Sequence, residues 1–162
     1  MDEKDIQLLR LLVSNGRMSL REMGKKTGIK PTSVFNRIKK LESSVIRRYT
    51  VEVDEKQLGL GVVAYVLVSY VKKERTQQAI AQKLSHYPQV IETAIITGEW
   101  DMLLKVVEKD VDALGKFITT VLRELPEIAS TNTLVTFDIE RDNNTLDLIR
   151  PQKGRSISGA GE

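Results

Sequence analysis

The sequence of 162 residues contains no cysteine, one histidine and one tryptophan, and only 5% of its residues are aromatic. Without cysteine the chain has neither a disulfide framework nor a thiolate metal site. No apolar run approaches the roughly 20 residues that a membrane-spanning helix needs, and residues 1–5 are charged rather than signal-like. We therefore expect a soluble, cytoplasmic protein with no membrane partner.

The residue patterns that enzymes need are missing as well. The sequence has no glycine-rich phosphate loop, no paired spacing of metal ligands and no nucleophile–base set. Its only histidine, His86, stands before Tyr87 and Pro88 at an expected helix end, where an imidazolium favours the helix dipole. The sequence thus predicts no catalytic residue, no metal site, no cofactor and no enzymatic activity.

Positive charge is concentrated in the first third of the chain. Residues 1–56 hold 13 Lys/Arg and 8 Asp/Glu, a net charge of +5, whereas residues 57–141 hold 9 and 11, a net charge of −2. A basic lobe of this kind is typical of nucleic-acid-binding modules. Anionic lipid is the alternative partner, but no amphipathic helix here combines bulky aromatic residues with lysine.

Two short helices joined by a tight turn are predicted between Ser19 and Leu41. Ser19 and Glu22 form a capping box at the start of the first helix. Gly28 permits the turn because glycine takes a left-handed backbone without steric penalty, and Pro31 suits the first turn of the second helix. With an earlier amphipathic helix near the N-terminus, this is a helix-turn-helix plan.

The second helix of the pair has two contrasting faces. At about 100° per residue, Val34, Ile38 and Leu41 fall in one apolar stripe. The opposite side carries hydroxyl, amide and ammonium groups, which suit base edges and phosphates in a DNA groove. An ordinary solvated helix face is the alternative. The residues that we predict to bind DNA are Lys30, Thr32, Ser33, Asn36, Arg37, Lys39, Lys40, Arg47 and Arg48.

Some of these basic residues have a second interpretation. Arg37 lies near the apolar stripe and either contacts phosphate or forms an ion pair within its own domain. Arg47 and Arg48 fall in residues 45–53, where apolar and polar residues alternate as in a strand with one wet face. We interpret this strand as a wing, on which the two arginines either touch phosphate or remain solvated.

The second half of the chain predicts a βαββαβ order, the arrangement of a ferredoxin-like domain, and the whole an α+β fold. The expected strands are 62–71, 90–97, 101–107 and 134–139, the helices are 76–87 and 110–125, and a hairpin turn falls at 98–100. We assign residues 1–53 to a winged helix-turn-helix domain, 54–61 to a linker and 62–141 to the ferredoxin-like domain. Residues 142–162 are expected to be a partly disordered tail.

These features together resemble the Lrp/AsnC family of feast/famine regulators. The resemblance rests on the run Val-Phe-Asn-Arg-Ile-Lys-Lys-Leu-Glu at 34–42, Val-Ile-Arg-Arg-Tyr at 45–49 and Thr-Gly-Glu-Trp-Asp at 97–101. Two departures stand out: Lys30 replaces a hydroxyl cap worth about 1 kcal/mol, and no glycine precedes Val45, which leaves the angle of the wing open.

The resemblance implies a domain that reads a palindromic operator in double-stranded DNA and a RAM-type effector domain that forms a homodimer and often an octamer. It also implies that a small molecule, frequently an amino acid, binds between subunits near the 98–101 turn. The alternative for the 98–101 run is an ordinary hairpin turn, in which Asp101 caps the turn instead of holding a ligand ammonium. Trp100 is unusual on such a turn, and a ligand pocket or a subunit interface would explain it. The residues implied for effector binding are Thr97, Gly98, Glu99, Trp100, Asp101, Thr131 and Thr133.

The sequence therefore predicts a sequence-specific transcriptional regulator whose assembly or DNA affinity is modulated by a small metabolite. Two other functions compete with this one. Siroheme decarboxylases resemble the same family, but they need basic or imidazole groups around a tetrapyrrole, and this chain has a single histidine. Non-specific DNA packaging is the other alternative, with the second domain serving only for assembly.

Overall fold

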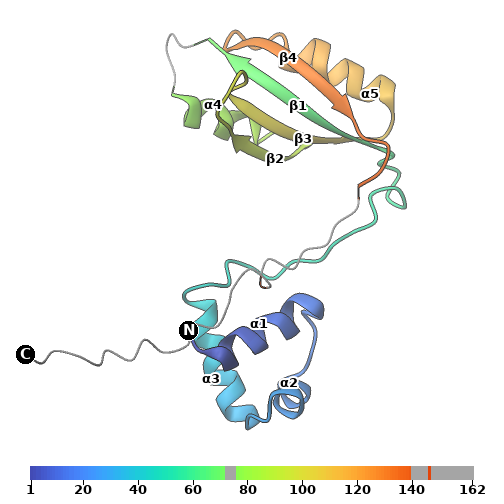
Figure 1. Cartoon of the computed structure of the whole chain (residues 1–162). Helices are drawn as coiled ribbons and strands as arrows, with labels where there is room; N and C mark the ends of the chain where they lie inside the picture. Colours follow the sequence, from blue (N-terminus) through green and yellow to red (C-terminus); the bar gives the residue numbers. More distant parts are fainter. Residues whose placement is uncertain (72–75, 140–145, 147–162) are drawn as a thin grey trace, which may run out of the picture. The chain divides into compact units, whose positions relative to one another are not determined.

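The computed structural model describes residues 1–71, 76–139 and 146. It divides the chain into a helical unit, Met1–Glu52 with Arg141–Glu162, and a sheet unit, Val53–Glu140 (Figure 1). In chain order the elements are α1 (Glu3–Ser14), α2 (Leu20–Thr27), α3 (Pro31–Glu42), β1 (Val62–Tyr70), α4 (Gln77–Leu84), β2 (Val90–Ile95), β3 (Met102–Glu108), α5 (Val111–Lys116), the π-helix η1 (Phe117–Leu122) and β4 (Ile128–Val135).

Capping residues, a glycine and a proline set where the helices of the helical unit begin and end. Ser19 and Glu22 form the predicted capping box, each side chain accepting a bond from the other's backbone N–H. Gly28 ends α2 with φ 69°, the left-handed conformation that glycine tolerates best. Pro31 opens α3, and Lys30 before it makes no side-chain cap. The predicted helix pair is confirmed.

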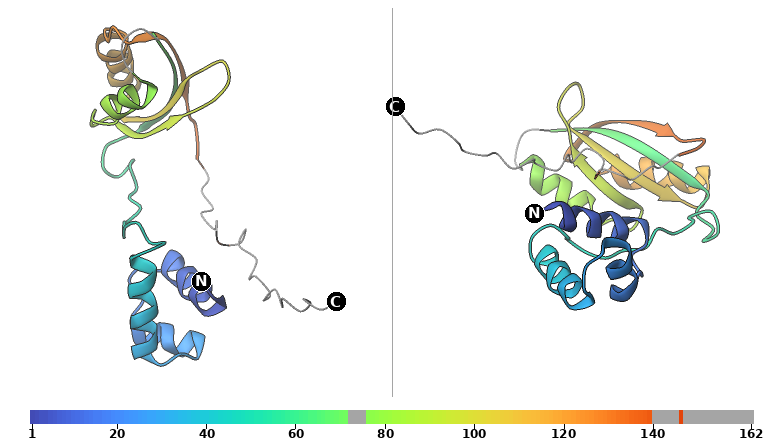
Figure 2. Two further views of the ribbon diagram at one scale, coloured as in Figure 1. Left: turned by 90° about the vertical axis from the view of Figure 1, so that its left-hand side faces the viewer. Right: turned by 60° about the horizontal axis from the view of Figure 1, so that its bottom comes forward.

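Two apolar clusters hold the helical unit together. Leu8, Met23, Val34 and Ile38 form the first cluster, between the three helices that Figure 2 shows crossing one another. The second cluster joins Leu9 of α1 and Leu41 of α3 to Leu146. Of the predicted tail, 142–162, Leu146 alone is described, so the rest of that prediction lies outside the described residues.

The strand that we predicted over residues 45–53 is wrong. The segment is not part of a sheet, and Tyr49, Val51 and Val53 are 54%, 79% and 49% exposed. A strand is stable only when its backbone groups pair with a neighbour, and no described strand lies beside this one. The expected turn at 54–61 is present, with Gly59 at φ 77°.

The sheet unit has four antiparallel strands in the order β2-β3-β1-β4. Both α4 and α5 lie on one side of this sheet (Figures 1 and 2). Successive strand residues point to opposite faces, so Ala64, Val66 and Val68 of β1 are buried beneath the helices. Tyr65 and Leu67, which alternate with them, are only half-buried. The α+β fold with a ferredoxin-like domain is confirmed.

Several boundaries in the sheet unit differ from the prediction. The last strand is Ile128–Val135 rather than 134–139, and Phe137 beyond it is fully exposed. As an edge strand with one uncovered face, β4 can be polar, which hides it from a search for apolar alternation. The helix predicted over 110–125 starts as expected after the Asp110 cap, but it widens into a π-helix and stops at Leu122.

Candidate nucleic-acid interface

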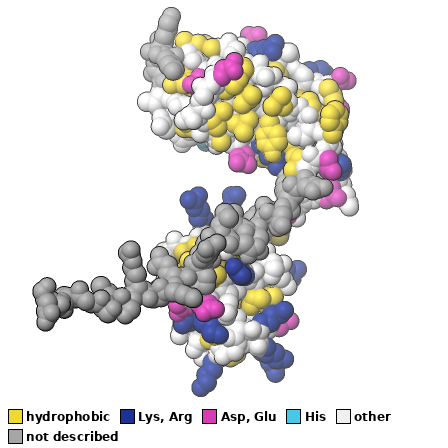
Figure 3. All heavy atoms as spheres, viewed as in Figure 1, with side chains coloured by type: hydrophobic (Ala, Val, Ile, Leu, Met, Phe, Trp, Pro, Cys, Tyr) yellow, Lys and Arg dark blue, Asp and Glu magenta, His cyan; other side chains and the backbone are white. Residues whose placement is uncertain are grey.

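Helix α3 buries one side and exposes the other. Val34, Ile38 and Leu41 pack into the helical unit. Figure 3 shows lysine and arginine side chains standing out from this unit. The outer side of α3 carries groups that bond base edges and phosphates, with α2 and the Gly28 turn before it, as in a helix-turn-helix. The exposed residues of this reading face are Thr32, Ser33, Asn36, Lys39 and Lys40.

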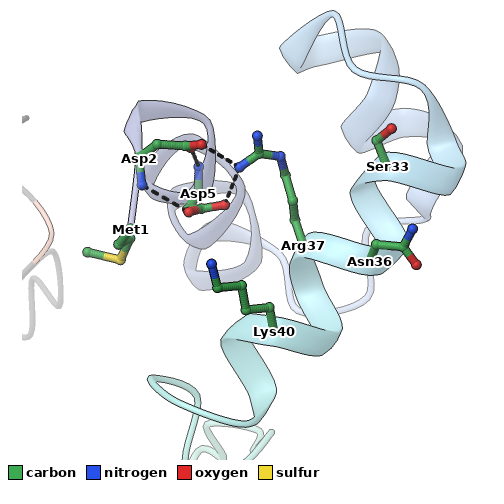
Figure 4. Close-up of a pocket in the computed structure, with 7 residues that line it drawn as sticks. All are labelled: Met1, Asp2, Asp5, Ser33, Asn36, Arg37 and Lys40. Atoms are coloured by element: carbon green, nitrogen blue, oxygen red, sulfur yellow. Dashed lines mark hydrogen bonds and ion pairs between the residues drawn. The ribbon is translucent and has the colours of Figure 1, made fainter.

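Arg37 lies at one edge of the reading face and is held by α1. Its Nη1 donates to Asp2 Oδ2 at 2.7 Å and to Asp5 Oδ1 at 2.6 Å (Figure 4). The hydrogen bonds to both carboxylates raise the pKa of Arg37. The ion pair that we considered as the second interpretation of Arg37 is therefore present, and a phosphate contact by Arg37 stays a prediction.

Asp2 and Asp5 are the partners of Arg37 that the sequence reading missed. They form a capping box on α1: Asp5 N–H donates to Asp2 Oδ1 and Asp2 N–H donates to Asp5 Oδ2, both at 2.9 Å. The hydrogen bond from the Asp5 backbone N–H and, to a smaller extent, the one from Arg37 lower the pKa of Asp2. The Asp-x-x-Asp spacing signals a cap, but nothing in the sequence pairs it with a residue more than 30 positions away.

A hollow of about 580 Å³ lies where this ion pair meets the reading face. Figure 4 shows carboxylates on its α1 side and polar or cationic groups on its α3 side. An approaching phosphate would meet both signs of charge there. The hollow is lined by Met1, Asp2, Asp5, Ser33, Asn36, Arg37 and Lys40.

The other edge of α3 is aromatic. Lys39 Nζ lies 5.3 Å from the ring centroid of Phe35, which is 45% exposed, in a cation–π contact. Tyr49 OH donates to Glu42 Oε1 at 2.9 Å. Partial burial and, to a smaller extent, the hydrogen bond to Glu42 raise the pKa of Tyr49. Lys39 is thus drawn toward this edge, while Asn36 remains at the centre of the reading face.

The remaining predicted DNA contacts lie at the two ends of α3. Lys30 is exposed just before the helix, and Arg47 and Arg48 are exposed in the extended segment after it. All three side chains reach solvent on the helical unit, but no wing strand fixes the two arginines. Their phosphate contacts stay predictions.

The predicted effector turn is a loop between β2 and β3 in the sheet unit. Strand β2 ends at Ile95 and β3 begins at Met102, so the loop is longer than the hairpin turn that we expected at 98–100. Thr97 and Glu99 are exposed and Trp100 is half-buried. Gly98 has φ 123°, which a side chain would strain.

Asp101 fastens this loop to its neighbours. Its Oδ2 accepts a bond from Tyr70 N–H at 3.2 Å, and its backbone oxygen accepts one from Gln77 Nε2 at 2.7 Å. Its own N–H donates to Val68 O at 3.1 Å. Asp101 therefore has the turn-capping role that we considered as its alternative, and a bond to a ligand ammonium stays a prediction.

Thr131 and Thr133 lie on β4, beside Val68 and Val66 of β1. Cross-strand partners share a face, so both threonines point to the helix-covered side of the sheet. Thr131 Oγ1 accepts a bond from Arg123 Nε at 3.2 Å. Thr131 and the 96–101 loop meet β1 from opposite sides at Val68, whereas Thr133 lies further along the strand.

The described ranges contain neither a cluster of metal ligands nor a membrane-spanning helix. Across residues 1–71, 76–139 and 146, no three His, Asp or Glu side chains are placed to hold a metal ion. In the same ranges, no helix has the length and apolar character needed to cross a bilayer.

The fold and the reading face define a helix-turn-helix DNA-binding protein with a separate ferredoxin-like domain. A sequence model of the AsnC-type helix-turn-helix domain matches residues 1–42, and one of the Lrp/AsnC ligand binding domain matches residues 63–146. The chain belongs to the Lrp/AsnC family of DNA-binding transcriptional regulators, which are not enzymes.

Curated relatives cover almost the whole chain. An uncharacterised helix-turn-helix-type transcriptional regulator of Pyrococcus abyssi is 37% identical over 144 residues, which are 88% of this chain and 96% of the relative. The transcriptional regulator AzlB of Bacillus subtilis is 33% identical over 143 residues, 87% of this chain and 91% of AzlB.

Solved structures agree with this assignment. Escherichia coli AsnC superposes with a TM-score of 0.78 at 27% identity, covering 88% of this chain and 97% of AsnC. A Neisseria meningitidis transcriptional regulator in complex with L-Met superposes with a TM-score of 0.83 at 24% identity, covering 88% and 93%, and shows the common fold.

Proposed function

We propose that this regulator reads a specific operator through α3 and changes its assembly or DNA affinity when a small metabolite, an amino acid, binds the sheet unit. We assign DNA reading to residues 1–53, effector binding and assembly to 62–141, and the place of action to the cytoplasm. The observation that carries the DNA part is that α3 exposes Asn36 and its polar neighbours while it buries the opposite side.

The test of DNA reading is fluorescence anisotropy with a duplex from upstream of the protein's own gene and a random duplex of equal length. The upstream duplex is expected to bind at least a thousandfold more tightly at physiological salt. Asn36→Ala is expected to weaken this binding roughly tenfold, because a side chain bonded to a base edge is worth about 1–3 kcal/mol. Equal affinity for both duplexes would support DNA packaging instead.

A homodimer is supported by the uncovered face of the sheet. Leu134 of β4 is 50% exposed and lies beside Tyr65, while Leu67 pairs with Leu103 on the same face. Figure 3 shows hydrophobic side chains gathered on the sheet unit. An isologous dimer would bury this face and would match the symmetry of a palindrome.

Light scattering tests the assembly. We expect a dimer, or an octamer built from dimers, and Leu134→Glu is expected to shift the protein toward monomer. A monomeric wild-type protein at micromolar concentration would contradict this part of the proposal. Gln78→Glu, at an exposed position on α4, serves as a charge-matched variant away from the uncovered face.

The effector proposal rests on the match to a ligand binding domain and on the loop around Trp100. Because Trp100 is the only tryptophan, its fluorescence reports directly on this loop. The Neisseria relative of the same fold was solved with L-Met, so methionine is the first amino acid to titrate. A flat response to every amino acid would contradict effector binding here without affecting the proposal for DNA reading.

The residues that we propose around the effector come from the 96–101 loop and from β4. We propose that a bound ligand changes how dimers pack against one another, which changes the spacing of their DNA-reading helices. Sizing the protein with and without ligand tests this coupling. The proposed residues are Thr97, Gly98, Glu99, Trp100, Asp101, Thr131 and Thr133.

A further inference from the structure

The ion pair at the edge of the reading face places negative charge beside a surface that has to meet DNA. Two carboxylates, from Asp2 and Asp5, share the single guanidinium of Arg37, and both bonds are made by Nη1. One negative charge is therefore left over in this group. The side chain of Asp2 is 54% exposed and that of Arg37 is 34% exposed, so solvent and solutes reach the pair.

The position of Arg37 on α3 shows why this matters. Ser33 precedes it by four residues and Lys40 follows it by three, spacings that put all three side chains on one strip of the helix. Figure 4 shows this strip lining the hollow together with Asn36, with the Arg37 side chain directed to α1. If it were released from the carboxylates, the guanidinium would belong to the reading face.

We propose that Asp2 and Asp5 determine specificity by withholding Arg37 from DNA phosphate. A phosphate contact strengthens binding to every sequence alike. Withholding one such contact lowers non-specific affinity and leaves the base-edge contacts of Asn36 and Ser33 unchanged. The ratio of specific to non-specific affinity therefore rises, an instance of discrimination by a repulsive element. This proposal rests on α3 being the reading helix.

The two carboxylates have different roles in holding Arg37. The Asp5 side chain is nearly buried, at 8% exposure, and also accepts a bond from the Asp2 backbone, so it anchors the pair. Asp2 is the exposed partner, and its Oδ1 caps α1 while its Oδ2 holds Arg37. A substitution at Asp2 can thus remove one of the two bonds that hold Arg37, while the bond to Asp5 and the cap remain.

The test compares Asp2→Asn with Glu3→Gln. Asparagine caps a helix as well as aspartate does, and its amide oxygen still accepts from Asp5 N–H. Glu3→Gln makes the same change in net charge one residue further along α1, at an exposed side chain, while Arg37 keeps its bonds to Asp2 and Asp5. Any difference between the two variants is therefore not due to overall charge, and adding Arg37→Met tests whether Arg37 is its source.

Anisotropy titrations on a random duplex and on the upstream duplex, at several salt concentrations, give the readout. Asp2→Asn is expected to bind the random duplex more tightly than Glu3→Gln does, by at most about fivefold because Asp5 still bonds Arg37. The slope of log affinity against log salt is expected to be steeper by at most about one. The specificity ratio is expected to fall by a similar factor. Adding Arg37→Met to Asp2→Asn is expected to abolish the gain.

Identical affinities and slopes for Asp2→Asn and Glu3→Gln would overturn the proposal, as would a gain that persists in the double variant. Circular dichroism checks that each variant is folded, and Asp2→Ser, which keeps a cap without charge, replaces Asp2→Asn if that protein is unfolded. Asn36→Ala distinguishes a failure of the specificity proposal from a failure of the proposal that α3 reads DNA. If it weakens upstream binding while Asp2→Asn behaves like Glu3→Gln, only the specificity proposal fails; if Asn36→Ala has no effect, the reading face itself is wrong.

Discussion

The helical unit and the sheet unit are stabilised by different means. Among the described residues, the sheet unit has one core cluster of 13 buried side chains, whereas the helical unit has two separate clusters, of four and three. The helical unit adds capping boxes on α1 and α2 and the ion pair between α1 and α3. It therefore depends more on polar contacts at its surface, close to the reading face.

This difference has a functional meaning. A reading head must leave polar and cationic groups in solvent, so it has little apolar surface to bury, and local chemistry has to define its helices. The sheet unit can bury one whole face beneath α4 and α5 while its other face stays uncovered. Perturbing burial is expected to act mainly on the sheet unit, and perturbing charge mainly on the helical unit.

The largest effect is expected from removing core volume in the sheet unit. Leu104 of β3 is completely buried, and Leu104→Ala is expected to destabilise this unit by about 2–5 kcal/mol through lost burial and the remaining cavity. Urea unfolding followed by Trp100 fluorescence measures it. Val111→Ala, at a 62% exposed position, is expected to change stability by less than about 0.5 kcal/mol. Similar effects of the two variants would break the comparison.

Two glycines give opposite predictions in the two units. A Cβ on Gly24 of α2 would lie 2.7 Å from Ile29 O in the turn before α3, whereas one on Gly115 of α5 would meet nothing within 4 Å. Gly24→Ala is expected to destabilise the helical unit by about 1–3 kcal/mol. Gly115→Ala is expected to stabilise its helix by about 0.5–1 kcal/mol. Thermal unfolding of both variants decides, and a stable Gly24→Ala protein would contradict the close packing of the turn.

Charge removal should affect DNA binding only in the helical unit. If Lys40 contacts phosphate as proposed, Lys40→Ala is expected to weaken binding to all sequences by a similar factor and to lower the salt slope by about one. Lys116→Ala, at an exposed position on α5 of the sheet unit, makes the same change in charge and is expected to leave both quantities unchanged. Equal losses for the two variants would mean that only overall charge matters.

The smallest effect is expected on acidification. Hydrogen bonds from backbone N–H groups at helix starts lower the pKa values of Asp2 and Glu22 in the helical unit and of Asp110 in the sheet unit. Each carboxylate stabilises the fold fully above its ordinary pKa, 3.8 for Asp and 4.5 for Glu, and this contribution is lost as the pH falls through the lower folded value.

With two such groups against one, the helical unit should lose stability first below about pH 4. Amide NMR spectra recorded along an acid titration would follow both units at once. Glu22→Gln is expected to reduce the acid sensitivity of the helical unit alone. Simultaneous loss of both units would show that they unfold together.

The accuracy of the sequence reading follows the range of the interactions involved. The Ser19 capping box, the Gly28 turn and Pro31 act within four residues, and all three are confirmed. The strand expected at 45–53 failed because pairing depends on a distant partner, which alternation alone does not supply. The sequence did not identify the hydrogen-bond partners of Arg37 and Asp101 for the same reason, since these partners lie 24 to 35 residues away.

Leu146 has a consequence for how the protein is made. Its backbone oxygen accepts a bond from Arg10 Nη2 at 3.4 Å, across 136 residues of sequence, and its side chain covers Leu9 and Leu41. The ribosome must therefore translate the entire sheet unit before the second apolar cluster of the helical unit is complete. A nascent chain that stops within the sheet unit carries a reading head in which Leu9 and Leu41 still lack their contact with Leu146.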